Sequence, residues 1–430
     1  MFRRGGTILK RVITTILFLV LVASSISYAE GLNLTAESAI LIDMDTGQIL
    51  YEKNPHLKLH PASTTKIMTG ILAIENGNLN DVVTVDEETP YVIKGSHIAL
   101  EPGEKLTLKD LLYALLIESA NDSALVIAKH IAGTAEEFAK MMNDKAKELG
   151  ALNTNFVNPH GLTDENHLTT AYDLSLIARY AMKNETFREI VSNYTYTIPP
   201  TNKKDESRYL KSHNELLYSS KKIAVDGKLV PIKYEGATGI KTGYTTEAGN
   251  CLVASAERNN KRLIAVVLKS TGNEMFSDIH KLFNYGFENF DKVTLATKNE
   301  FIQNFQVKNG KLPIVPGIIK DDFSYFLPKD YSDKVTQKIE VDEELKAPIE
   351  EGEIIGKVNY YLDGELLGSV DIVSTISVER DSASAILEFI KENWYIGAFL
   401  LISVIGTLGY IKQRKRRKKK YRRTYYNFPI

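Results

Sequence analysis

Residues 60–69 read His60-Pro61-Ala62-Ser63-Thr64-Thr65-Lys66-Ile67-Met68-Thr69. Apolar residues at helical spacing follow Pro61 and predict a helix over residues 66–75. Ser63 then lies at the helix N-terminus, where the helix dipole favours developing negative charge. Lys66 follows one turn later, close enough for its amine to reach the Ser63 hydroxyl. This stretch predicts a serine nucleophile with a lysine partner.

Two more short motifs complete a candidate site: Ser119-Ala120-Asn121 and Lys241-Thr242-Gly243. In this chain order they read as a polar bridge followed by a strand that docks an acyl substrate. Second copies of the patterns, at residues 219–222 and 212–214, lie in polar stretches. Only the first copies lie next to predicted apolar helices, which can hold their side chains in a fixed orientation.

Each motif also has a plainer interpretation. Lys66 alone reads as a solvated helix charge, whereas burial near Lys241 would lower its pKa and make it a base. Ser119 and Asn121 are suited to relaying a proton and holding a substrate amide, or to ending one helix and capping the next. Gly243 lets a substrate backbone lie against the strand edge, or marks a bulge or turn.

The surrounding sequence predicts an α/β (α+β) fold, with an antiparallel sheet flanked by helices over residues 30–291. A strand, a turn and a second strand are expected over residues 39–51, and an antiparallel meander over 240–245, 251–256 and 263–268. Further helices are predicted over 106–117, 122–132, 135–149, 170–183 and 276–287.

Residues 292–378 have a different character. Alternating apolar and polar stretches with turn residues such as Asp363-Gly364 predict a second, small all-β domain. No cluster of acids, bases or nucleophiles is visible there, so we interpret it as a spacer or docking module. Residues 379–393 are expected to form a linker.

The two ends of the chain predict attachment to a membrane. Basic residues, an apolar run and Ser27-Tyr28-Ala29 are typical of a signal peptide over residues 1–29. Residues 394–411 carry no charge and predict a transmembrane helix, and residues 412–430 form a basic tail that the positive-inside rule assigns to the cytoplasm. The alternatives are a buried core helix and a nucleic-acid-binding tail.

The charge balance and the cysteine count limit the choice. Residues 30–411 carry a formal charge of −15, which disfavours nucleic acid as a partner. Cys251 is the only cysteine, so an intramolecular disulfide is impossible. We therefore expect the region between the two ends to lie on the outer side of the cytoplasmic membrane, stabilised by an ordinary core.

The three motifs together resemble the serine-type D-alanyl-D-alanine carboxypeptidases, the low-molecular-weight penicillin-binding proteins. Three further stretches are similar to that family: residues 158–162, 171–174 and 249–256. The similarity spans about residues 34–290, with a weaker match to the family's β-rich C-terminal domain beyond. The resemblance implies a β-lactamase/transpeptidase-like fold.

The resemblance also implies roles for particular residues. Ser63 would attack the carbonyl of the penultimate D-alanine of peptidoglycan stem peptides, and Lys66 would take its proton. The backbone N–H groups of Ser63 and Tyr244 would form the oxyanion hole. Lys241 and Thr242 would bind the terminal carboxylate or its β-lactam equivalent, so β-lactams are expected inhibitors.

Two departures from the family pattern stand out. Members are often tethered by an amphipathic C-terminal helix, whereas this chain has a candidate spanning segment and a basic tail. No clear arginine follows residues 269–272 to help bind the substrate carboxylate.

Two other functions remain open. A class A-like β-lactamase shares the motif order and would need a carboxylate such as Glu165 to activate water. A catalytically silent wall-binding scaffold is the second alternative. We expect no cofactor and no metal, because the eight histidines show no ligand spacing such as H-E-x-x-H.

Overall fold

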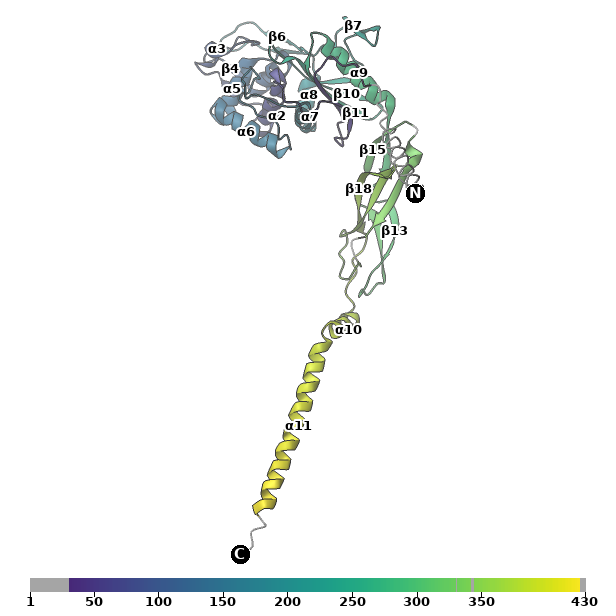
Figure 1. Ribbon diagram of the computed structural model, residues 1–430. Helices are drawn as coiled ribbons and strands as arrows, with labels where there is room; N and C mark the ends of the chain where they lie inside the picture. Colours follow the sequence, from purple (N-terminus) through teal and green to yellow (C-terminus); the bar gives the residue numbers. More distant parts are fainter. Residues whose placement is uncertain (1–30, 330, 342–343, 426–430) are drawn as a thin grey trace, which may run out of the picture. The chain divides into compact units, whose positions relative to one another are not determined.

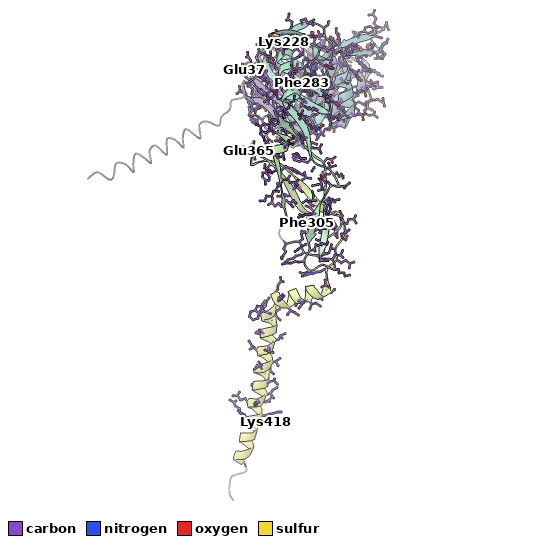
Figure 2. All side chains as sticks on the ribbon, turned by 90° about the vertical axis from the view of Figure 1, so that its right-hand side faces the viewer. Glu37, Lys228, Phe283, Phe305, Glu365 and Lys418 are labelled. Atoms are coloured by element: carbon purple, nitrogen blue, oxygen red, sulfur yellow. The ribbon has the colours of Figure 1, made fainter. Side chains whose placement is uncertain are left out.

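The computed structural model describes residues 31–329, 331–341 and 344–425. The expected signal peptide lies outside these residues. The chain divides into two compact units, the first ending at Asp291 and the second beginning at Lys292. Phe283 in the first unit and Phe305 in the second are both buried (Figure 2).

The first unit is built on a five-stranded antiparallel sheet with the order β2-β1-β11-β10-β9. Its strands are β1 (Ser38–Asp43), β2 (Ile49–Lys53), β9 (Ala237–Thr245), β10 (Gly249–Arg258) and β11 (Lys261–Ser270). The N-terminal hairpin joins the later meander through the pairing of β1 with β11. The predicted sheet is therefore confirmed, and β9 forms one edge of it.

Helices and three small strand pairs surround this sheet. The helical elements are η1 (Ala62–Thr65), α2 (Lys66–Asn76), α3 (Thr89–Val92), α4 (Leu108–Tyr113), η2 (Ala114–Glu118), α5 (Asn121–Ala132), α6 (Ala135–Glu148), α7 (Ala171–Ala181), α8 (Glu185–Ser192), η3 (Glu215–Leu217) and α9 (Glu274–Asn289). The strand pairs are β3 (Val82–Thr84) with β4 (Lys105–Thr107), β5 (Thr195–Ile198) with β6 (Arg208–Lys211), and β7 (Lys222–Val225) with β8 (Lys228–Pro231).

Both faces of the central sheet are covered, which explains why its strands read as apolar runs. Successive side chains of a strand point to opposite faces. Ile40 and Ile42 belong to the core that includes α2, α4, α5 and α7. Leu41, between them, approaches Gly286 of α9, where an added Cβ would lie 2.8 Å from the Leu41 side chain. Helix α9 packs on β10 and β11, and α7 contacts β1 and β11 (Figure 1).

The helix predicted over residues 106–117 differs from the structure. Residues 105–107 are the strand β4, and the helix begins at Leu108 because Thr107 caps it. The Thr107 hydroxyl accepts from Asp110 N–H (3.1 Å), and the Asp110 carboxylate accepts from Thr107 N–H (3.3 Å). The last turn, η2, is a π-helix. Helix α8 and the three small strand pairs were not predicted.

The second unit contains a five-stranded sheet with the order β13-β14-β18-β17-β16 and a two-stranded pair, β12 with β15. Its elements are β12 (Phe290–Ala296), β13 (Phe301–Gln306), β14 (Ile314–Ile319), β15 (Phe323–Pro328), η4 (Ser332–Lys334), β16 (Val335–Glu340), β17 (Ile354–Leu362) and β18 (Glu365–Ser374). Asp363 and Gly364 both have positive φ, as a tight hairpin turn requires. The predicted all-β domain is confirmed.

Two helices follow the all-β domain in the chain. Residues 379–393, the expected linker, include α10 (Ser382–Glu392). Helix α11 (Trp394–Tyr425) contains a segment, Trp394–Lys418, that is long and apolar enough to cross a membrane by length and composition.

Candidate active site

Ser63 lies in a short, strained turn at the start of α2. Ala62, directly before it, has φ +48°, a conformation that residues with a side chain rarely adopt. Two hydroxyls hold the turn: Thr64 donates to the carbonyl of Pro61 (2.7 Å) and Thr65 to that of Ala62 (2.8 Å). The turn therefore presents Ser63 in one defined orientation.

Lys66 is fully buried directly beside the serine. Its Nζ lies 2.9 Å from Ser63 Oγ, 2.6 Å from Asn121 Oδ1 and 2.7 Å from the carbonyl oxygen of His160. Burial lowers the pKa of Lys66 well below its usual value, and the positive charge of Lys241 lowers it further. Asp122 acts in the opposite direction. The plainer interpretation of Lys66 as a solvated helix charge does not fit this environment.

The second motif joins two helices beside Lys66. Ser119 follows η2 with φ +66°, and Asn121 begins α5. Both polar ends of the Asn121 side chain are engaged within the protein, because Oδ1 accepts from Lys66 and Nδ2 donates to the carbonyl of Lys94 (2.6 Å). Asn121 N–H donates to the carbonyl of Ser96 (2.7 Å). Asn121 therefore links Lys66 to the loop at residues 94–96.

The third motif lies on the edge strand β9, next to the Ser63 turn. Lys241 is 2% exposed, and burial lowers its pKa to about 7, although Glu118 opposes the shift. Gly243 contacts the turn so closely that a Cβ there would lie 2.9 Å from the backbone nitrogen of Ser63. Gly243 pairs in regular register with Cys251, so it is not a bulge. Its lack of a side chain allows β9 to pass directly beside Ser63.

These elements enclose a cleft of about 270 Å³. The lining residues are Ser63, Ser96, Ser119, His213, Thr242, Gly243, Tyr244, Asn250 and Met275. Five of the predicted site residues line this cleft, whereas Lys66, Asn121 and Lys241 are buried behind its surface. Sequence reasoning missed Ser96, Asn250, Met275 and His213. His213 belongs to the second copy of the Ser119-Ala120-Asn121 pattern, at residues 212–214, so a polar stretch also contributes to the site.

The loop at residues 158–161 supports the site from behind. The carbonyl of His160 is one acceptor of Lys66, and that of Pro159 accepts from Thr69 of α2 (2.6 Å). Gly161 packs on the Ser63 turn, since a Cβ there would lie 1.9 Å from the carbonyl oxygen of Ala62. Only the resemblance had drawn attention to this loop, because backbone acceptors leave no signal in residue type. Glu165, the carboxylate considered for a β-lactamase, is exposed.

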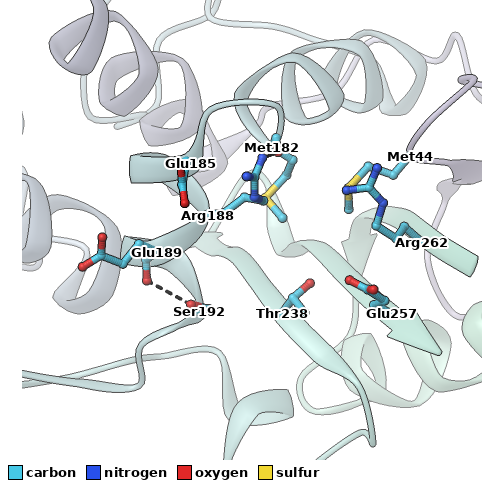
Figure 3. A pocket seen from close by; sticks show the side chains of 9 residues that line it. All are labelled: Met44, Met182, Glu185, Arg188, Glu189, Ser192, Thr238, Glu257 and Arg262. Carbon is cyan, nitrogen blue, oxygen red and sulfur yellow. Dashed lines mark hydrogen bonds between the residues drawn. The ribbon is translucent and has the colours of Figure 1, made fainter. Parts of the chain in front are cut away.

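A larger groove of about 380 Å³ lies beside α8 (Figure 3). Thr238 of β9, Glu257 of β10 and Arg262 of β11 contribute to it, together with Arg188. The serine in this groove, Ser192, donates its hydroxyl to the backbone carbonyl of Glu189 (2.9 Å). No lysine lines this groove. The smaller cleft at Ser63 is therefore the candidate active site.

The site combines a buried lysine, a partly exposed serine beside it, and an adjacent edge strand. This combination is typical of serine enzymes that form acyl intermediates. The D-alanyl-D-alanine carboxypeptidase family model matches residues 25–272, and the model "Penicillin-binding protein 5, C-terminal domain" matches residues 290–380. The chain belongs to the D-alanyl-D-alanine carboxypeptidase family.

Individual relatives agree with this assignment. The carboxypeptidase DacF of Bacillus subtilis is 35% identical over 368 residues, which cover 84% of this chain and 90% of the relative. The crystal structure of penicillin binding protein 5 from Haemophilus influenzae is 30% identical, with a TM-score of 0.70 over 81% of this chain and 98% of the other. That of PBP3 from Streptococcus pneumoniae is 26% identical, with a TM-score of 0.66 over 80% and 100%.

Proposed function

We propose that this enzyme removes the terminal D-alanine from peptidoglycan stem peptides through an acyl-enzyme on Ser63, and that penicillins acylate the same residue. The observation that carries the proposal is the 2.9 Å contact between Ser63 Oγ and the buried Nζ of Lys66. The family membership supports the substrate class.

Lys66 is suited to act as the base. A neutral amine has two N–H donors and one lone pair. The two donors match Asn121 Oδ1 and the His160 carbonyl, so the lone pair is left for the Ser63 proton. As Ser63 Oγ bonds to the substrate carbonyl carbon, its proton passes to Lys66. The proton then passes to the amine of the departing D-alanine, with Ser119 as the relay, and water hydrolyses the ester.

The developing oxyanion would be bound by the backbone N–H groups of Ser63 and Tyr244. The close approach of Gly243 to the Ser63 nitrogen supports this role, because it brings the two backbones together. Loss of one such donor costs about 3 to 4 kcal/mol of transition-state stabilisation in well-studied hydrolases.

The substrate would lie along the edge of β9, which has no strand partner on its outer side among the described residues. Thr242 and Lys241 would bind the terminal carboxylate, and Gly243 leaves room for the substrate backbone. Asn121, whose side chain is occupied by Lys66 and Lys94, would contribute by holding the base in place.

We also propose the topology that the sequence predicts. A signal peptide over residues 1–29 would direct export, the segment 394–411 would span the cytoplasmic membrane, and the tail at 412–430 would remain in the cytoplasm. The apolar stretch within α11 supports the membrane anchor. The catalytic region, residues 30–291, would then face the peptidoglycan, with the region 292–378 as a spacer or docking module.

The direct test is acylation of the purified full chain by a fluorescent penicillin, followed by mass analysis of the Ser63 peptide. We expect a covalent adduct on Ser63, no labelling of Ser63→Ala, and release of D-alanine from a tripeptide ending in D-Ala-D-Ala. Failure of the wild-type chain to label would favour a silent scaffold. Rapid nitrocefin turnover without D-alanine release would favour a β-lactamase.

A further inference from the structure

A buried histidine behind the Ser63 turn has no part in the mechanism above. His167 is 1% exposed, and its ring packs edge-on against Phe156 at 5.7 Å between centroids. Its Nδ1 accepts a hydrogen bond from the backbone N–H of Val157 (3.0 Å). A neutral imidazole carries one proton, so this contact assigns the proton to Nε2.

The protonated nitrogen faces the nucleophile turn. His167 Nε2 lies 2.9 Å from Thr65 Oγ1, so the imidazole donates and the hydroxyl accepts. The Thr65 hydroxyl in turn donates to the carbonyl of Ala62 (2.8 Å). The three hydrogen bonds therefore run in one direction, from Val157 N–H to the residue immediately before Ser63.

This chain of hydrogen bonds, which we call the His167 relay, ends at Ala62, a strained position of the turn. Ala62 has φ +48°, and Gly161 packs closely against its carbonyl and against the Thr65 hydroxyl. A strained conformation persists only where its surroundings over-determine it. The Thr65 hydroxyl is the hydrogen-bond partner that holds the Ala62 carbonyl, and His167 fixes the orientation of that hydroxyl.

We infer that His167 is a positioning residue for acylation: through Thr65 it holds the Ala62 carbonyl, and thereby keeps Ser63 Oγ in line with Lys66. The inference rests on the proposed role of Ser63 as nucleophile. Because His167 does not line the cleft and its ring hydrogen-bonds Thr65 and Val157, we expect its effect to fall on the alignment of the reacting atoms and not on substrate binding.

The charge state of His167 suits a permanent relay. Burial lowers its pKa to about 4, with smaller contributions from His60 and Lys66 in the same direction and from Asp164 in the opposite one. The imidazole is therefore neutral at the pH of the cell envelope, and the direction of the relay stays the same. His60 adds to the fixation, since its Nδ1 donates to the His167 carbonyl (3.1 Å).

The test compares His167→Phe with His167→Gln in the full chain. Phenylalanine keeps the ring packing and removes both hydrogen bonds, whereas glutamine retains an acceptor and a donor about as far apart as the ring nitrogens. We expect the limiting acylation rate constant by a fluorescent penicillin to fall about tenfold or more in His167→Phe, since small misalignments of reacting groups cost that much. The dissociation constant of the non-covalent complex should stay within twofold. His167→Gln should recover most of the rate.

Variants of Thr65 test whether the effect passes through the relay. Thr65→Val should slow acylation as His167→Phe does, and Thr65→Ser should not. The double variant Thr65→Val/His167→Phe should be no slower than the slower single variant, because both interrupt one chain of hydrogen bonds. Tyr196→Phe is the control for lost stability, since it removes a hydrogen bond to Asp110 (2.8 Å) away from the site. It should lower the melting temperature without slowing acylation.

Unchanged acylation in His167→Phe would overturn the inference while leaving the proposed function intact. The inference would also be overturned if the two substitutions slowed acylation additively in the double variant, or if His167→Phe weakened only the non-covalent binding of penicillin. The same holds if Tyr196→Phe, with a melting temperature equal to that of His167→Phe, slowed acylation equally. A wild-type chain that is not acylated would overturn both proposals. If His167→Phe does not fold, the acylation rates of Thr65→Val and Thr65→Ser, compared with each other, decide whether the hydrogen-bond chain aligns Ser63.

Discussion

The interiors of the two units differ in what they bury. The first unit buries charged or titratable side chains near its cleft, among them Lys66, Lys241, Asp122 and His167. In the described part of the second unit, the buried polar side chains are those of Asn359 and Ser374, and the core is otherwise apolar. Burying an ionisable group costs free energy, so buried groups of this kind either are held by hydrogen bonds, as Asp110 is in the cap of α4, or gather at functional sites. The contrast separates the catalytic unit from the other.

The largest expected effect comes from removing the buried lysine that we propose as the base. Lys66→Met keeps a similar volume but has no proton acceptor, so we expect acylation by penicillin to slow by about 10²- to 10⁴-fold, the usual contribution of a positioned base. The measurement is the time course of fluorescent labelling. A loss below threefold would show that this buried lysine is structural, as the second unit's buried groups are.

The next effect concerns glycine in the two units. Gly243→Ala places a methyl group 2.9 Å from the Ser63 nitrogen, so the turn or β9 must move. We expect acylation to fall about 100-fold, because misplacing reacting groups by about an ångström costs that much. Gly364→Ala is the matched control. It has φ +87° and open space around it, so it should cost about 1 to 2 kcal/mol of stability and leave the rate unchanged.

A smaller effect concerns the electrostatic coupling of the two buried lysines. The charge of Lys241 lowers the pKa of Lys66, so Lys241→Gln removes that charge and should raise the pKa of Lys66. In the proposed mechanism acylation requires neutral Lys66, so the rising limb of the profile of acylation rate against pH should move to higher pH. The measurement is the limiting acylation rate from pH 5 to pH 10. Lys228→Gln, at an exposed position of β8, should not move the limb. A shift to lower pH in Lys241→Gln would contradict the proposed coupling.

The smallest effect is expected at the surface of the second unit. Lys357 lies 3.7 Å from Glu340, and both side chains are about half exposed. Lys357→Met should leave the unfolding free energy almost unchanged, because solvent screens exposed ion pairs. Acylation should be unchanged. A clear loss of acylation would mean that the second unit takes part in catalysis, which would remove the contrast between the two interiors.

The sequence predicted long, strongly patterned elements well and short, half-exposed ones poorly. The strands β10 and β11 carry continuous apolar runs because both faces of their sheet are covered. In the strands β5 and β6 apolar and polar residues alternate little and most residues are exposed, so the sequence pattern did not indicate a strand. The start of α4 was misplaced because the cap formed by Thr107 and Asp110 interrupts an apolar stretch that reads as helix throughout.

The candidate site was predictable where residue type carries the chemistry. The motifs at Ser63, Ser119 and Lys241 could be found because a hydroxyl or an amine is required at each. The acceptor at His160 could not, since any residue offers a backbone carbonyl. The role of His167 was equally hidden, because its tautomer depends on the backbone N–H of Val157 and on the packing around it.

The amino-acid sequence by itself determined the local geometry of this enzyme, in which a serine and a lysine share one helical turn and apolar periods mark the strands. Tertiary structure alone decided whether that lysine can act as a base. Its pKa depends on exclusion from water and on the charge of Lys241, which a separate edge strand contributes. Desolvation and charge proximity arise only when distant segments pack together, so no local pattern encodes them.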